Sequence, residues 1–136
     1  MNVLADTSVW SLALRRKPPA KLSTEERRLT ALLSAAIHDG RVVMIGPVRQ
    51  ELLSGIKDPA QFEKLRIALD VFRDEPLNTL DHEEAARLYN LCRSQGLECG
   101  PADILICALA ARRGWEILAN DASLNKCLEI VGPRQL

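Results

Sequence analysis

The feature that most constrains the fold is the alternation of short apolar runs with longer amphipathic segments along the chain. Apolar runs at residues 3–5, 42–45 and 116–119 predict buried strands, and residues 75–80 predict a weaker one. The other segments have helical periodicity, and we expect helices over residues 8–16, 23–40, 47–55, 58–72, 81–96, 101–114 and 120–130. Strands that alternate with helices indicate an α/β domain with a central, mainly parallel sheet flanked by helices.

Two of these helices begin with a capping signal. Ser23 is followed three residues later by Glu26, and Asp81 by Glu84, a spacing that satisfies free backbone N–H groups of a first helical turn. The segment 101–114 is apolar on nearly all sides. It therefore predicts a central helix that is buried all round.

The composition is that of an ordinary globular protein. The 136 residues suit a single domain, 1–136. The 18 basic and 18 acidic residues give zero net charge, so any binding of nucleic acid must use local patches. The one local basic cluster is Arg15-Arg16-Lys17, which is either a solvated loop or a contact for RNA phosphates. Without an apolar run of roughly 20 residues or a signal-peptide pattern, we expect a cytoplasmic protein that is not in the membrane.

The cysteines do not show the spacing of a metal site. Cys92, Cys99, Cys107 and Cys127 include no C-x-x-C pair, and the chain has only two histidines. A structural zinc site is therefore poorly supported. We expect all four cysteines to be reduced thiols in or near the core.

Four acids are expected at one edge of the sheet. Asp6 and Asp121 each follow an apolar strand, and Glu51 lies in the helix that leaves the second strand. Asp103 occupies the first turn of the apolar helix. Because parallel strands end at the same edge, where α/β folds bind ligands, Asp6, Glu51 and Asp121 should emerge together. Asp103 joins them if its helix begins there.

Each acid also has a structural explanation of its own. Asp6 and Asp121 can cap the helices that follow them, Asp103 gains from the positive end of its helix, and Glu51 can be exposed. As a group they are harder to explain, because like charges about 4 Å apart repel by roughly 4 kcal/mol at an effective dielectric constant of 20. A cation that neutralises such a cluster, with hard oxygen ligands only, is Mg²⁺ or Mn²⁺. A site of this kind suits attack of water on a phosphodiester.

The acidic motifs resemble those of PIN-domain ribonucleases. Asp6 in "LADTSVW", Glu51 in "VRQELLSG", Asp103 in "GPADILICALA" and Asp121 in "ILANDASL" match that family in order and spacing, over nearly the whole chain. The compact length resembles the VapC-type toxins of prokaryotic toxin–antitoxin pairs.

The resemblance implies an enzyme: a Mg²⁺- or Mn²⁺-dependent endoribonuclease that leaves 5′-phosphate and 3′-hydroxyl ends. It implies an RNA substrate, a homodimer and a small cognate antitoxin that neutralises the toxin. The four acids are carried over as catalytic, metal-binding carboxylates. Thr7 or Ser8 is expected to hold a metal-bound water or to orient Asp6.

One motif departs from the family pattern. Ala119 stands where the family usually has Thr, and Ser123 where it has a second acid, which bears on whether one or two metals bind. This departure supports an alternative, a catalytically weak PIN-like module that binds RNA or a partner. A phosphatase with Asp6 as nucleophile is a further alternative, but it normally needs an acid at the position of Ser8. Trp10 is expected in core or dimer packing, with stacking on a base as the other possibility.

Overall fold

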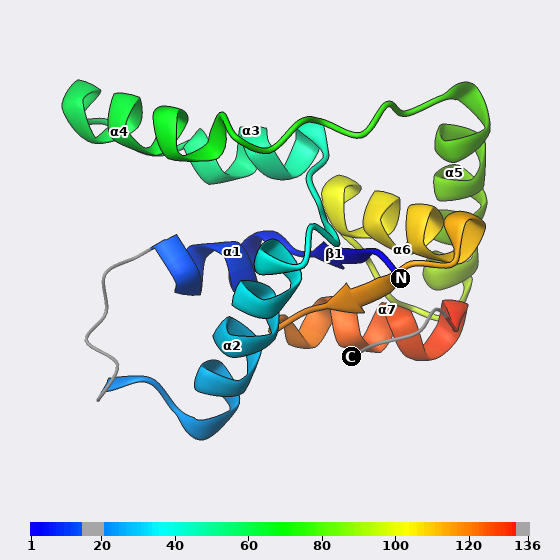
Figure 1. Cartoon of the computed structure of the whole chain (residues 1–136). Coiled ribbons are helices and arrows are strands. Elements are labelled where there is room, and N and C mark those ends of the chain that lie inside the picture. The colour runs from blue at the N-terminus through cyan, green and yellow to red at the C-terminus, as the bar shows by residue number, and fades with distance from the viewer. Residues whose placement is uncertain (15–20, 133–136) are drawn as a thin grey trace.

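The fold is described by a computed structural model for residues 1–14 and 21–132 (Figure 1). The elements in chain order are β1 (Val3–Ala5), α1 (Thr7–Leu14), α2 (Thr24–His38), β2 (Val42–Val43), α3 (Gly46–Leu53), α4 (Pro59–Leu69), α5 (Thr79–Ser94), α6 (Pro101–Arg113), β3 (Glu116–Leu118) and α7 (Ala122–Val131). The expected alternation of strands and helices is confirmed. The basic cluster at residues 15–17 lies outside the described residues.

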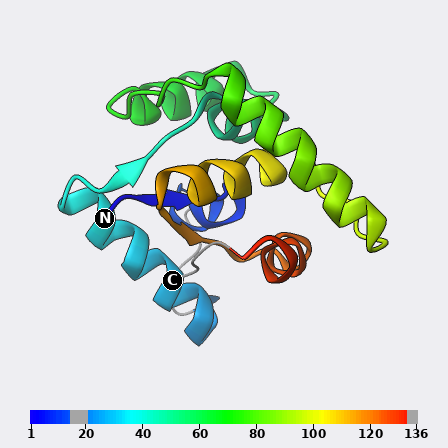
Figure 2. The same cartoon turned by 90° about the vertical axis from the view of Figure 1, so that its right-hand side faces the viewer.

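The three strands form one parallel sheet in the order β2-β1-β3. Val3 pairs with Val42 on one side and with Glu116 on the other. All three strands therefore end at the same edge, on the left of the sheet in Figure 1. Figure 2 shows α2 on one side of this sheet and α6, with α5 beyond it, on the other. The parallel α/β architecture agrees with the sequence prediction.

The strand expected at residues 75–80 is not formed. Beyond β2, Met44 makes a single parallel bridge with Asp74, and the Glu75 N–H donates to the Met44 carbonyl over 2.8 Å. Pro76 follows and has no N–H to continue the ladder. The chain then enters α5 two residues earlier than expected.

The start of α5 corrects the capping prediction. Asn78 is the N-cap, and it forms a capping box with Asp81, whereas Glu84 pairs with Arg87. The Asp81 carboxylate is fully buried and accepts from Arg112 over 2.6 Å and from Arg113 over 2.7 Å. Sequence spacing could not reveal these partners, because Arg112 and Arg113 lie in the last turn of another helix, α6. Asp81 thus joins the start of α5 to the end of α6.

Helix α6 is the buried central helix that its composition predicts. Every residue from Ile104 to Ala110 is buried, and the helix packs against α5, α7 and β3. Gly114 ends it with φ +68°, a left-handed conformation that glycine adopts without strain. The chain then reverses into β3. Because α6 runs back along the strands, its N-terminus lies at the edge where they end (Figure 1).

Trp10 belongs to the core. Its side chain is 1% exposed and meets Phe72 edge to face, with ring centroids 5.0 Å apart. Core packing is confirmed, and a base has no access to stack on this ring.

The prediction that all four cysteines are reduced thiols is wrong for two of them. Cys99 and Cys127 form a disulfide, whereas Cys92 and Cys107 are free and buried. The pairing was not predictable from spacing, because it depends on the packing of the segment before α6 against α7. No helix of the described residues is long and apolar enough to cross a membrane.

Candidate functional site

Asp6 lies at the carboxyl end of the central strand. Its N–H donates to the Leu118 carbonyl of β3 over 2.9 Å, which extends the sheet pairing by one step. Its Oδ1 accepts from Ser8 Oγ over 2.6 Å and from the Val9 N–H over 3.0 Å. Asp6 therefore caps α1, as its structural explanation predicted, with a side chain that is held in one orientation.

Ser8 links Asp6 to the end of β3. Its hydroxyl donates to Asp6 and accepts from the Asn120 N–H over 3.3 Å. Of the two roles expected for Thr7 or Ser8, the hydrogen bond supports orientation of Asp6 by Ser8. The contribution of Asn120 comes from its backbone, which gives no signal in the sequence.

Asp103 lies in the first turn of α6, after the N-cap Gly100 and Pro101. The turn faces the edge of the sheet because α6 runs antiparallel to the strands. The side chain of Asp103 is half-buried. A Cβ built on Gly100 would lie 3.8 Å from Asp103 Oδ2, so the carboxylate folds back over the helix start.

Asp121 and Glu51 complete the group from opposite sides. Asp121 precedes α7, and its Oδ1 accepts from the Leu124 N–H over 3.4 Å, so its expected role as a helix cap is confirmed. Glu51 lies in α3 and is exposed. The group thus has one buried acid, Asp6, one exposed acid, Glu51, and two half-buried acids, Asp103 and Asp121.

Electrostatic interactions link Asp103 to the other three acids. Burial, followed by the charges of Asp121, Asp6 and Glu51, raises the pKa of the Asp103 carboxyl to about 6. Burial also raises the pKa of Asp6, with a smaller contribution from Asp121 and with the hydrogen bonds from Ser8 and Val9 opposing it. The structure therefore brings together the four acids that the sequence singled out.

The donor set fits a hard divalent cation. It consists of carboxylates alone, the ligands of Mg²⁺ and Mn²⁺, and the charges of Asp121, Asp6 and Glu51 add to burial in raising the pKa of Asp103. Within the described part of the chain, no three acids place carboxylate oxygens within 4.8 Å of one another. The arrangement is consequently an open site and not a closed cage.

The irregular motif, residues 119–124, begins with Ala119. Ala119 is buried at the end of β3, with 6% exposure. It offers no ligand atom, and its methyl group belongs to the core. Of Ala119 and Asp121, only Asp121 can therefore contribute a metal ligand from this motif.

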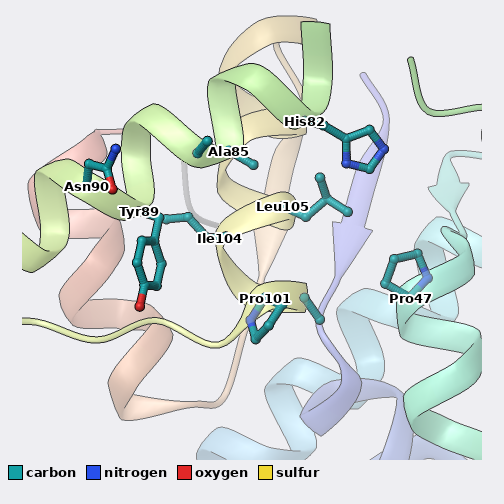
Figure 3. A pocket seen from close by; sticks show the side chains of 10 residues that line it. Pro47, His82, Ala85, Tyr89, Asn90, Pro101, Ile104 and Leu105 are labelled. Carbon is teal, nitrogen blue, oxygen red and sulfur yellow. The ribbon is translucent and has the colours of Figure 1, made fainter. Parts of the chain in front are cut away.

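An apolar pocket of about 440 Å³ lies beside the site (Figure 3). The starts of α3 and α6 contribute Pro47 and Pro101, and α5 contributes His82 and Tyr89. Asp103 is not among the lining residues. His82 is exposed at the start of α5.

Comparison with known proteins identifies the fold. The family model of the PIN domain matches residues 3–127. No curated protein matches the chain at a significant level. Among solved structures, VapBC2 from Rickettsia felis bound to a DNA fragment from their promoter has a TM-score of 0.75 at 18% identity, over 100% of this chain and 98% of that one.

Two further structures have the same fold. FitAcB from Neisseria gonorrhoeae has a TM-score of 0.74 at 20% identity, covering 98% of this chain and 96% of that chain. FitAB bound to an IR36 DNA fragment has a TM-score of 0.72 at 21% identity, covering 98% and 93%. At these identities the likeness concerns the fold.

Proposed function

Since the chain belongs to the PIN domain family, whose members are nucleases, we propose that it is a Mg²⁺- or Mn²⁺-dependent endoribonuclease. The observation that carries this proposal is the convergence of Asp6, Glu51, Asp103 and Asp121, in which burial and then the charges of the other three acids raise the pKa of Asp103. Carboxylates gathered at the carboxyl edge of a parallel sheet suit a cation that acts on a phosphodiester. We assign these four acids as the metal-binding, catalytic residues.

In this assignment each side chain has a distinct task. Asp6, buried and fixed by Ser8 and Val9, sets the position of the inner ligand. Asp103 and Asp121 supply carboxylate oxygens from the starts of two helices. Glu51, the exposed member, lies where it can reach the ion or a water beside the incoming phosphate. A bound Mg²⁺ or Mn²⁺ would polarise the phosphoryl oxygen and lower the pKa of its water.

The biological role that we propose is the toxin of a toxin–antitoxin pair. The VapBC2 and FitAB structures are toxin–antitoxin complexes and share the fold of this chain over nearly its whole length. We further propose a single domain spanning residues 1–136, a homodimer, a cytoplasmic location, and neutralisation by a small cognate antitoxin.

Sequencing of the RNA ends produced when the chain is induced in cells tests this proposal. We expect new 5′-phosphate ends at defined positions with the native chain and none with Asp6→Asn. Asp39→Asn, an exposed acid at the end of α2, is the matched control and should cut like the native chain. Cleavage that persists unchanged in Asp6→Asn would contradict the assignment.

A catalytically weak module that binds RNA or a partner is the competing function. Its support is Ala119, a buried residue without a ligand atom in the last acidic motif. Calorimetric titration with Mn²⁺ separates the two functions, because a degenerate site would show no saturable binding. We expect saturable binding that is lost in Asp6→Asn.

A further inference from the structure

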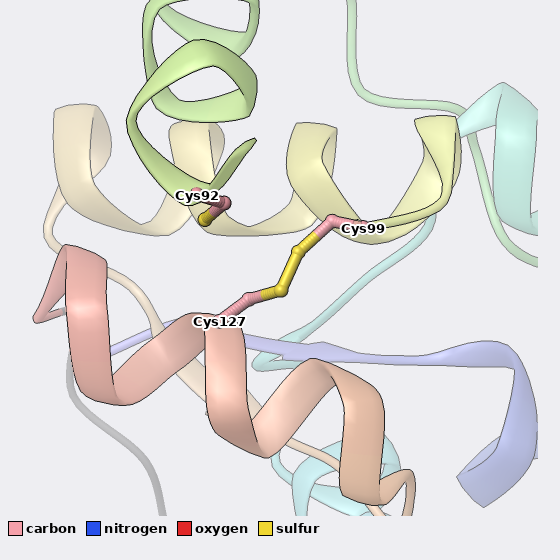
Figure 4. A group of neighbouring side chains, drawn as sticks. All are labelled: Cys92, Cys99 and Cys127. Atoms are coloured by element: carbon pink, nitrogen blue, oxygen red, sulfur yellow. A yellow bond between two sulfur atoms is a disulfide. The ribbon is translucent and has the colours of Figure 1, made fainter. Parts of the chain in front are cut away.

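Three cysteines meet in the core outside the acidic site. The Sγ atoms of Cys92, Cys99 and Cys127 all lie within 4.8 Å of one another, and all three side chains are buried. Figure 4 shows them arriving from three places: Cys92 from α5, Cys99 from the segment that enters α6, and Cys127 from α7. Cys99 and Cys127 are joined, and Cys92 is the third, free thiol beside them. The proposed nuclease reaction uses none of them.

The disulfide connects the two segments that carry the central acids. Cys99 lies four residues before Asp103, and Cys127 lies six residues after Asp121. Helices α6 and α7 also pack against each other. A covalent bond between Cys99 and Cys127 therefore fixes the distance between the start of α6 and the body of α7.

Electrostatic repulsion between Asp103 and Asp121 opposes the close approach that the disulfide maintains. Asp103 and Asp121 carry like charges that interact, and like charges repel more strongly in a partly buried site than in water. Their repulsion drives the start of α6 away from α7. The disulfide opposes that separation, so the oxidised chain keeps the carboxylates close in the absence of a cation.

We propose that Cys92, Cys99 and Cys127 form a thiol–disulfide site that controls the metal affinity of the acidic site, an inference that rests on the proposed function. The Cys99–Cys127 disulfide holds Asp103 and Asp121 in the geometry for binding a cation. Reduction releases the start of α6 and weakens that binding. Cys92 is the alternative partner for either of the other two sulfurs.

The chemistry needs an external low-molecular-weight thiol or disulfide. In oxidation, the Cys99 thiolate attacks a glutathione disulfide, forming a mixed disulfide and releasing one glutathione thiolate. The Cys127 thiolate then attacks Cys99 Sγ and releases the second glutathione. The two thiol protons go to solvent, two electrons pass from the protein to glutathione disulfide, and reduction by a dithiol reverses these steps. Burial raises the pKa of the Cys92 thiol, so Cys92 exchanges with the Cys99–Cys127 disulfide only slowly.

Calorimetric titration with Mn²⁺ on the full chain tests the inference. The chain is compared after treatment with glutathione disulfide and after treatment with dithiothreitol, with mass mapping of alkylated peptides to establish the thiol state. We expect the Cys99–Cys127 disulfide in the oxidised chain, and an affinity for Mn²⁺ that falls about fivefold on reduction, which lies at the low end of coupling between sites. Reduction should also lower Tm by about 10 °C, because the disulfide closes a loop of 28 residues.

Variants separate the tether from a general effect of thiols. Cys127→Ser should have the weaker affinity in both states, and on oxidation its Cys92 and Cys99 should pair. Cys107→Ser is the matched control, because Cys107 is also free and buried in α6 but lies outside the cluster. It should keep the full response to dithiothreitol.

Three outcomes would overturn the inference. The first is an equal affinity for Mn²⁺ in the oxidised and reduced native chain. The second is a loss of the response in Cys107→Ser, and the third is zinc bound to the three thiols in the purified protein. Absence of Mn²⁺ binding in both states, with the disulfide mapped and the Tm shift present, would instead contradict the proposed metal site along with its control.

Discussion

Replacement of Asp103 by asparagine tests the electrostatic cost of the acidic site. At neutral pH the folded chain holds the Asp103 carboxylate among three other acids, whereas in the unfolded chain it is solvated. The pKa of Asp103 rises from its ordinary 3.8 to about 6 on folding. Asp103→Asn removes this charge while keeping the size of the side chain. We therefore expect the variant to be more stable than the native chain without metal.

The magnitude follows from the pKa values. One pKa unit corresponds to about 1.4 kcal/mol, so the rise from 3.8 to about 6 corresponds to at most about 3 kcal/mol. Asp103 is only half-buried, and solvent screening lowers that limit, so we expect a gain of about 1–2 kcal/mol above pH 6.

Proton linkage fixes how the stability difference between the native chain and Asp103→Asn changes with pH. Between pH 3.8 and about 6 the folded state holds more protons on Asp103 than the unfolded state, so the native chain loses stability as pH rises through this window. Near pH 4 Asp103 is protonated in the folded chain, and the variant should gain almost nothing. Its advantage should appear between pH 4 and 6 and stay constant above.

Urea denaturation in EDTA, at pH values from 4 to 8, measures the effect. Glu129→Gln, which removes an exposed acid on α7, is the control and should show no such window. With saturating Mn²⁺, ligand binding should stabilise the native chain more than Asp103→Asn. A variant that is no more stable than the native chain at pH 8 in EDTA would refute the reasoning.

Three further predictions concern other parts of the structure. Asp81→Asn leaves Arg112 and Arg113 without their buried anion and should cost about 3–5 kcal/mol by urea denaturation. Burial raises the pKa of Asp81, but the hydrogen bonds from Asn78 and Arg113 outweigh burial and hold the pKa below 3.8. The native chain should therefore lose this contribution only as pH falls below 3.8, and a loss already at pH 6 would contradict the pairing. Ser8→Ala removes one of the two hydrogen bonds to Asp6 Oδ1 and should weaken Mn²⁺ binding in calorimetry about tenfold, as loss of a supporting hydrogen bond does, with unchanged affinity as the contrary result. Asp58→Ala removes the cap of α4 and should lower stability by about 1 kcal/mol in the same denaturation assay without altering Mn²⁺ affinity; an altered affinity would show that α4 is coupled to the site.

The placement of the four acids was predictable because it depends on simple rules. Asp6 and Asp121 follow strands, and the parallel order β2-β1-β3 puts those strand ends at one edge. Asp103 was expected at this edge only if its helix began there, and α6 meets that condition because it runs back along the sheet to reach β3. Local patterning was sufficient for each of these steps.

Features that depend on distant packing were not predictable in the same way. The sequence spacing indicated Asp81 as a helix cap paired with Glu84, but its charge is buried against Arg112 and Arg113, some 30 positions later. The cysteines were read one by one as small apolar side chains, yet Cys99 and Cys127 meet across two helices. The strand expected at residues 75–80 does not form: the pairing is a single bridge at Asp74, because Pro76 cannot continue it.

The most direct test of the central claim is cleavage of a labelled RNA by the purified chain as Mn²⁺ is added. Asp6→Asn is measured beside the native chain, and Asp39→Asn serves as the exposed control. We predict that the native chain and Asp39→Asn cut the RNA only with the metal, stop on addition of EDTA, and leave 5′-phosphate ends, whereas Asp6→Asn is inactive. Equal cleavage by Asp6→Asn, or cleavage by the native chain in EDTA, would contradict a metal site built on the four acids.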